Sequence, residues 1–144
     1  VTIINGGISG DTMAGGAERV EWAISQQPDW VIIALGGNDG LRGIEPNQTR
    51  QNLMAIIEAL QARKIKTILA GMLAPSNWGR SYATSFNRIY PELAQKYNIP
   101  LYPFLLDGVA MEPLYNQQDG IHPNADGVRV IVDKFAPFIQ QHIQ

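Results

Sequence analysis

The chain has 144 residues, 45% of them hydrophobic and 17% charged, a composition typical of one globular domain with a single core. Its formal net charge of -2 provides no basic field that would hold a phosphate backbone, which argues against a nucleic-acid partner. The absence of cysteine excludes disulfides, a thiolate nucleophile and Cys-ligated zinc. No apolar run approaches the length of about 18 residues that a membrane span needs, so we expect no stable membrane insertion.

Four short apolar runs predict β-strands, at residues 2–4, 30–35, 67–72 and 101–104. Each run is almost continuously apolar, which is typical of strands buried on both faces of a parallel sheet. The sequence begins at Val1, directly before the first run and without an initiator methionine, so we expect that an upstream segment is missing.

Helical spacing of apolar residues predicts helices at residues 17–25, 51–63, 81–97 and 128–143, with the last two interrupted at Pro91 and Pro137. The alternation of strands and helices predicts one domain with a doubly wound, flavodoxin-like α/β fold, in which helices on both faces of a parallel sheet make three layers. In such folds the reactive groups gather beyond the carboxyl ends of the strands.

A glycine-rich peptide, residues 5–12, follows the first run and precedes a helical pattern. Its glycines let the backbone approach a ligand closely, and the N–H groups at a helix start attract an anion. The same peptide also suits a tight turn in which Asp11 or Thr12 caps the helix. The peptide by itself leaves both interpretations open.

A second peptide, Gly36-Gly37-Asn38-Asp39-Gly40, follows the second run. Its glycines allow the Asn38 amide to project into a cleft and donate to an oxyanion. Asn-Asp-Gly is also strong turn chemistry, and taken alone the peptide favours a turn.

A third peptide, Asp119-Gly120-Ile121-His122, places a carboxylate three residues before a histidine. A local turn would bring Asp119 against Nδ1 of His122 and leave Nε2 free to take a proton from a nucleophile. An isolated Asp-x-x-His pair is also compatible with a structural contact or part of a metal site.

Taken together and in this order, the three peptides resemble sequence blocks of the SGNH, or GDSL-type, serine hydrolases. Gly10 corresponds to the second block, residues 36–39 to the third and residues 119–123 to the fifth. The runs 36–43, 90–91 and 119–124 are similar to the bacterial thioesterase, arylesterase and lysophospholipase branch.

The resemblance implies an SGNH hydrolase fold and hydrolysis of carboxylic esters or thioesters through an acyl-enzyme. In this scheme His122 is the general base and then the general acid, and Asp119 orients it. The Gly10 N–H and the Asn38 side-chain amide hold the oxyanion, together with the N–H of the nucleophilic serine. No metal or organic cofactor is implied.

The main departure from the family is that no Gly-Asp-Ser, the block that supplies the nucleophile, occurs in the sequence. We therefore expect the serine to lie upstream, on a strand that the family places inside the sheet between residues 2–4 and 30–35. A missing N-terminal segment or a second chain would then complete the sheet. Ser9 and Thr12 are poor replacements, because the resemblance assigns their peptide to backbone donation.

Leu41 and Pro75 are candidate substrate-binding residues, because their loops, 41–44 and 73–78, follow strand ends and offer an apolar wall for an acyl group. Ordinary crossover loops with exposed apolar residues would have the same composition. The expected partner is a small acyl ester or thioester, and the resembling branch implies a periplasmic or secreted location.

Two other interpretations are compatible with part of the sequence. A catalytically inactive flavodoxin-like module would bind a ligand or partner in the same cleft. A nucleotide-binding domain would use Gly6 and Gly7 to hold phosphate, but the chain has neither Gly-x-Gly-x-x-Gly nor a P-loop lysine, and Asp119 and His122 would have no role.

Overall fold

A three-stranded parallel sheet forms the centre of the protein, which we describe from a computed structural model that covers residues 1–143. The strands are β1 (Trp30–Ile33), β2 (Lys66–Ala70) and β3 (Leu101–Tyr102), in the order β1-β2-β3. In the β1–β2 register, Trp30 lies opposite Lys66 and Ile33 opposite Leu69. The runs predicted at residues 30–35, 67–72 and 101–104 therefore form strands, each somewhat shorter than expected.

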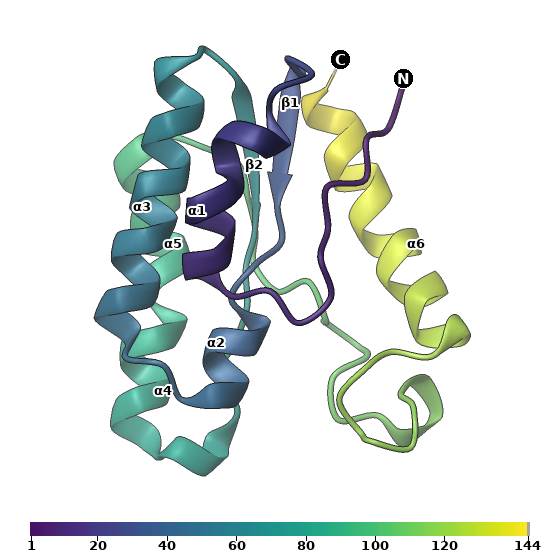
Figure 1. Cartoon of the computed structure of the whole chain (residues 1–144). Coiled ribbons are helices and arrows are strands. Elements are labelled where there is room, and N and C mark those ends of the chain that lie inside the picture. Colours follow the sequence, from purple (N-terminus) through teal and green to yellow (C-terminus); the bar gives the residue numbers. More distant parts are fainter. Residues whose placement is uncertain (144) are drawn as a thin grey trace.

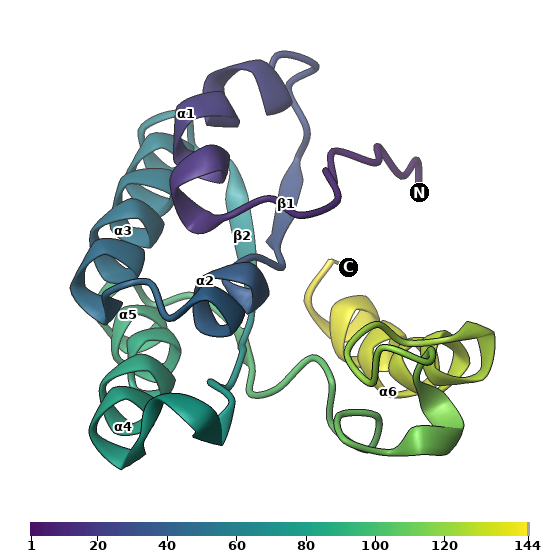
Figure 2. The same ribbon diagram turned by 60° about the horizontal axis from the view of Figure 1, so that its bottom comes forward.

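Helices cover both faces of this sheet (Figures 1 and 2). One face carries α1, α3, α4 and α5, and α6 lies on the other side. The six α-helices within residues 1–143 are α1 (Met13–Ala23), α2 (Gly37–Arg42), α3 (Pro46–Ala62), α4 (Arg80–Asn87), α5 (Ile89–Tyr97) and α6 (Ala125–His142). Two 3₁₀ turns, η1 (Ser76–Trp78) and η2 (Pro113–Tyr115), complete the elements. The predicted three-layer α/β fold is confirmed.

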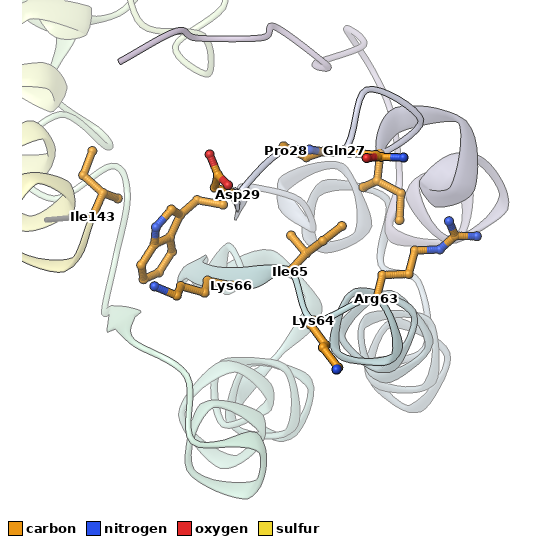
Figure 3. A pocket seen from close by; sticks show the side chains of 10 residues that line it. Gln27, Pro28, Asp29, Arg63, Lys64, Ile65, Lys66 and Ile143 are labelled. Carbon is orange, nitrogen blue, oxygen red and sulfur yellow. The ribbon is translucent and has the colours of Figure 1, made fainter.

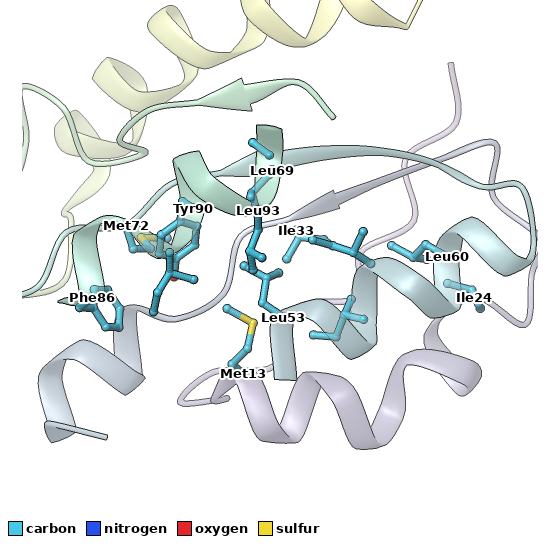
Figure 4. Close-up of a cluster of buried hydrophobic side chains, with 14 residues drawn as sticks. Met13, Ile24, Ile33, Leu53, Leu60, Leu69, Met72, Phe86, Tyr90 and Leu93 are labelled. Atoms are coloured by element: carbon cyan, nitrogen blue, oxygen red, sulfur yellow. The ribbon is translucent and has the colours of Figure 1, made fainter. Parts of the chain in front are cut away.

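The main hydrophobic core lies between the sheet and the layer of α1, α3 and α5 (Figure 4). Helix α3 contributes every third or fourth residue to it, and Leu53, Ile57 and Leu60 are completely buried. Burying one such side chain stabilises the fold by about 1.5–3 kcal/mol. This core holds α1 against α3 and α3 against β2, and so places the loops that follow β1 and precede α1 side by side.

Helix α6 is held to the other side of the sheet by an aromatic cluster. The ring of Tyr102 in β3 lies 4.8 Å from that of Phe135 and 5.3 Å from that of Phe138, measured between centroids. Pairs of this geometry add about 0.5–1.5 kcal/mol each beyond their buried area. Val128 and Val132, one turn apart on α6, remain about half exposed.

The strand predicted at residues 2–4 is wrong. These residues form no strand, and residues 1–10 are all exposed, with Ile3 at 88%. A strand exists only where a neighbour accepts and donates its hydrogen bonds, and the segment has no such neighbour within residues 1–143. Strand β1 is consequently an edge of the sheet, and its Ile32 side chain is 42% exposed.

Both proline predictions need correction. The pattern at residues 81–97 does divide into two helices, but at Arg88 and not at Pro91, which is the third residue of α5. An N–H in the first turn of a helix has no acceptor within the helix, so proline costs little there. Pro137 does not end α6, which continues to His142. The carbonyl that Pro137 leaves without a donor belongs to Asp133, which is exposed to water.

The first and last helices begin earlier than the apolar spacing indicates, because capping residues set their starts. Thr12 caps α1, where its hydroxyl accepts the Gly15 N–H, and Asn124 caps α6. Within residues 1–143, no helix combines the length and apolarity required to span a membrane.

Candidate active site

The structure brings the two predicted oxyanion donors to neighbouring loops. The Asn38 side-chain amide donates to the carbonyl of Asp11 at 2.9 Å, one residue after Gly10. An asparagine amide has two N–H groups, so this bond leaves one for a ligand. The Gly10 N–H makes no hydrogen bond within residues 1–143. Two free N–H donors therefore lie at the start of α1 and of α2.

Charged side chains hold the backbone at Gly10 and at the next residue, Asp11. The Gly10 φ of +77° is accessible mainly to glycine. Arg42 donates to the Gly10 carbonyl at 3.2 Å, and Asp11 forms an ion pair with Arg19 at 2.7 Å. Because Arg42 belongs to α2, these contacts tie the Gly10 loop to the helix that carries Asn38.

Asn38 lies in the first turn of α2 and not in an isolated Asn-Asp-Gly turn, which corrects the turn interpretation. The chain enters α2 through Gly36, whose φ is +103°. A side chain at Gly36 would come within 1.9 Å of the Tyr90 hydroxyl, which itself donates to the Leu35 carbonyl. Glycine is required here by both backbone conformation and space.

Asp119 and His122 form the predicted pair. Asp119 Oδ2 lies 2.6 Å from His122 Nδ1, and Asp119 Oδ1 accepts the N–H groups of Ile121 and His122 at 2.9 and 3.0 Å. The His122 side-chain contact, followed by the two backbone donors, lowers the pKa of Asp119 to about 2. An ionised carboxylate only accepts, so the shared proton belongs to Nδ1.

The other ring nitrogen of His122, Nε2, has no hydrogen-bond partner among residues 1–143. The His122 side chain is 65% exposed. A histidine with Nδ1–H on a carboxylate and an open Nε2 has the tautomer and orientation of a general base.

Two asparagines that sequence reasoning missed hold the loop of this pair. Asn124 donates to the carbonyls of Leu114 and Asn116 and accepts two N–H groups at the start of α6. Asn116 is 7% exposed and donates to the carbonyls of Val109 and Glu112. The available signal was the position of Asn124 directly before a helical pattern, which is typical of an N-cap.

Asp39 is a further residue that sequence reasoning did not single out. Its carboxylate is 1% exposed and accepts from the Met13 N–H and the Thr49 hydroxyl, both at 2.9 Å. Its position beside Asn38 was the only signal in the sequence.

The loop predicted at residues 41–44 begins later than expected, because Leu41 lies in the last turn of α2, whereas Pro75 directly precedes η1. Leu41 is 40% exposed, and Pro75 lies against Gly40, where an added Cβ would meet the proline ring at 3.5 Å. Trp78 joins them, because its indole donates to the Gly40 carbonyl at 3.0 Å and its ring packs on Gly43. Pro75 and Trp78 thus lie against α2, the helix that carries both Asn38 and Leu41.

The oxyanion pair and the Asp119–His122 pair are separate in this structure. No hydrogen bond or ion pair joins one to the other within residues 1–143. The first pair belongs to the layer of α1 and α2 and the second to the loop before α6, and Figure 2 shows these parts on opposite sides of β1. The sequence prediction that all of them line one hollow thus stays a prediction.

Neither of two surface hollows contains the predicted site residues. One, of about 730 Å³, lies at the amino ends of β1 and β2, beside Trp30, Lys66 and Ile143 (Figure 3). Because chemistry in parallel sheets gathers at the carboxyl ends, this hollow is at the wrong end of the strands. A smaller one, of about 320 Å³, lies under the Asp119–His122 loop, beside Asn116 and Gly120. Within the part of the chain that the structure describes, no cluster of three His, Asp or Glu side chains offers a metal site.

Comparison with known proteins identifies close relatives of this architecture. The chain is 42% identical over 140 residues to the thioesterase 1/protease 1/lysophospholipase L1 of Escherichia coli strain K12, covering 96% of this chain and 67% of that protein. It is 36% identical over 144 residues to an arylesterase of Vibrio mimicus, covering 99% of this chain and 72% of that protein.

A solved structure has the same fold. The crystal structure of the psychrotrophic esterase EstA from Pseudoalteromonas sp. matches with a TM-score of 0.91 at 32% identity, covering 96% of this chain and 76% of that one. Relatives of this kind favour an enzyme over an inactive binding module. The model of the GDSL-like lipase/acylhydrolase family matches residues 1–130. The chain therefore belongs to the GDSL-like lipase/acylhydrolase family, the SGNH hydrolases.

Proposed function

We propose that this chain supplies the general base and two oxyanion donors of an enzyme that hydrolyses carboxylic esters or thioesters. The observation that carries the proposal is the 2.6 Å contact between Asp119 and Nδ1 of His122, which leaves Nε2 open. The relatives named thioesterase, lysophospholipase and arylesterase support small acyl esters and thioesters as the substrate class.

In the proposed reaction a serine hydroxyl attacks the acyl carbon while His122 Nε2 takes its proton. The negative carbonyl oxygen is stabilised by the Gly10 N–H and the second N–H of the Asn38 amide. The bond from carbon to the leaving oxygen or sulfur then breaks, and His122 protonates the leaving group. Water, deprotonated by His122, releases the acid in the same way. Asp119 stabilises the imidazolium in both halves of the reaction.

The nucleophilic serine comes, in this proposal, from outside these 144 residues. The sequence contains no Gly-Asp-Ser. Thr12 is committed to capping α1 through its hydroxyl, which accepts the Gly15 N–H at 3.2 Å. Ser9 lies in the exposed segment 1–10 and makes no hydrogen bond to His122 within residues 1–143.

An adjoining segment or a second chain would bring this serine on a strand that pairs with the free edge of β1. Two observations support this arrangement: β1 has one neighbour within residues 1–143, and Ile32, Val128 and Val132 leave apolar surface exposed on β1 and α6. A strand added between β1 and α6 would also place its serine between the oxyanion pair and the Asp119–His122 pair. From the resemblance to the bacterial thioesterase, arylesterase and lysophospholipase branch, we also propose a periplasmic or secreted location for the whole enzyme.

The proposal is tested by measuring hydrolysis of p-nitrophenyl esters and acyl thioesters. The 144-residue chain is compared with the same chain joined to an N-terminal segment that contains Gly-Asp-Ser. We expect activity only in the longer protein, and His122→Ala there should lower kcat by about 1,000-fold or more. Equal activity of the longer protein and its His122→Ala variant, or no activity in either length, would contradict the proposal.

A further inference from the structure

Asp39 is a buried carboxylate without a buried cation beside it. It is 1% exposed, and no ion pair within residues 1–143 involves it. Its two oxygens have one neutral partner each, since Oδ2 accepts the Met13 N–H and Oδ1 the Thr49 hydroxyl. Burying a charge in this way costs free energy that a neutral side chain would avoid. Packing alone therefore does not explain an acidic residue here, and the position calls for a role that the carboxylate performs.

The partners of Asp39 connect three elements around the oxyanion donors. Met13 is the first residue of α1, three residues after Gly10, and Thr49 lies in α3. Asn38, directly before Asp39, donates to the Asp11 carbonyl at 2.9 Å. Two consecutive side chains of α2 thus hold the segment 11–13, since Asn38 donates to the Asp11 carbonyl and Asp39 accepts the Met13 N–H.

A carboxylate is the group that suits these hydrogen bonds. It accepts at both oxygens, whereas an asparagine has one acceptor oxygen, so the Thr49 hydroxyl would have to turn and accept from the N–H₂ instead of donating. Its negative charge also lies at the N-terminus of the 11-residue helix α1, where the helix dipole favours an anion. The contact consequently sets the distance and angle between α1 and α2.

We propose that Asp39 is a positioning residue for the oxyanion hole. It locks the start of α1 against α2, so that the Gly10 N–H and the free N–H of Asn38 converge on one carbonyl oxygen. This inference rests on the proposed esterase function and adds to it the residue that determines the geometry of the two donors. Asp39 does not touch the substrate and acts through Asn38 and Gly10.

Asp39→Asn tests this role in the active, serine-containing protein, with Thr49→Ser as the matched control. The control removes a buried methyl group but keeps the hydroxyl that donates to Asp39. We expect Asp39→Asn to lower kcat by about 10- to 100-fold per active site, counted by fluorophosphonate titration, with KM changed by less than about threefold. Thr49→Ser should keep its kcat even if its stability falls.

The double variant Asn38→Ala/Asp39→Asn separates positioning from general destabilisation. Because Asp39 also positions the Gly10 N–H, the double variant should be slower than Asn38→Ala, but by a smaller factor than Asp39→Asn causes on its own. Multiplied losses, or a kcat per active site that Asp39→Asn leaves unchanged, would overturn the proposal.

A second readout decides the question without any hydrolysis. In the 144-residue chain, hydrogen exchange of the Asn38 side-chain N–H₂ is followed by NMR. Asp39→Asn should accelerate it by about 10-fold, and Thr49→Ser should leave it unchanged. Unaltered exchange in Asp39→Asn contradicts the positioning role, whereas accelerated exchange in a protein that never hydrolyses esters contradicts only the proposed function.

Discussion

At the scale of single residues, the acid of the Asp119–His122 pair has a measurable signature. The His122 contact is the largest cause of its low pKa, so His122→Ala should raise the pKa of Asp119 from about 2 toward its ordinary value of 3.8. Because the folded-state pKa is depressed, the contribution of Asp119 to stability is present above about pH 4 and disappears as the pH falls through 2. Titration of the Asp119 carboxyl carbon by NMR checks the pKa in both proteins, and an unchanged midpoint in His122→Ala would contradict the contact.

A second residue-scale prediction concerns Gly127, in the first turn of α6. A Cβ there would lie 2.1 Å from the carbonyl oxygen of Tyr115, so the backbone at the end of η2, where the loop to His122 begins, has to shift. Gly127→Ala should cost about 1–3 kcal/mol in the free energy of unfolding, measured in urea. Gly37→Ala is the control, because its Cβ meets nothing within 4 Å, and a change within about 0.5 kcal/mol is expected. Equal losses would show that the loop is not tightly packed on α6.

At the scale of elements, α3 shows how much of the fold depends on one buried helix face. Leu60→Ala removes a completely buried side chain from the core, and a loss of about 2–5 kcal/mol in unfolding free energy is expected. Gln51→Ala, on the exposed face of the same helix, should change stability by less than about 0.5 kcal/mol. Denaturant unfolding followed by circular dichroism compares the two, and a loss under about 1 kcal/mol for Leu60→Ala would contradict the packing.

The helices and strands also show which boundaries a sequence determines. The spacing of apolar residues identified α3 and β2, because a helix buried on one face has apolar residues at every third or fourth position and a strand buried on both faces is apolar throughout. The short helix α2 was missed, since Gly37-Asn38-Asp39-Gly40 has weak helical propensity and the helix is held by tertiary contacts of Asp39 and Trp78. The prediction of a break at Pro91 was wrong for a related reason, because the free-energy cost of proline depends on its position in the helix and is low in the first turn.

At the scale of the whole molecule, the free edge of β1 gives a prediction about completion of the sheet. In the 144-residue chain, the N–H groups of residues 30–33 that face away from β2 should exchange rapidly with solvent. In the serine-containing protein the same groups should be protected by about 10-fold or more. Hydrogen exchange measured by NMR distinguishes the two states. Fast exchange in an active longer protein would place the added strand elsewhere.

The sequence by itself determined the α/β class, the order of the elements, and the local Asp119–His122 contact, because each depends on neighbours within a few residues or on periodic burial. Only the tertiary structure decided that residues 2–4 are not a strand, that Asp39 links α2 to α1, and that Asn116 and Asn124 hold the loop of His122. Each of these features depends on contacts between different segments of the chain, and the spacing of apolar residues within one segment does not report such contacts. A strand needs its partner, and a buried polar group needs its donors, wherever in the chain they lie.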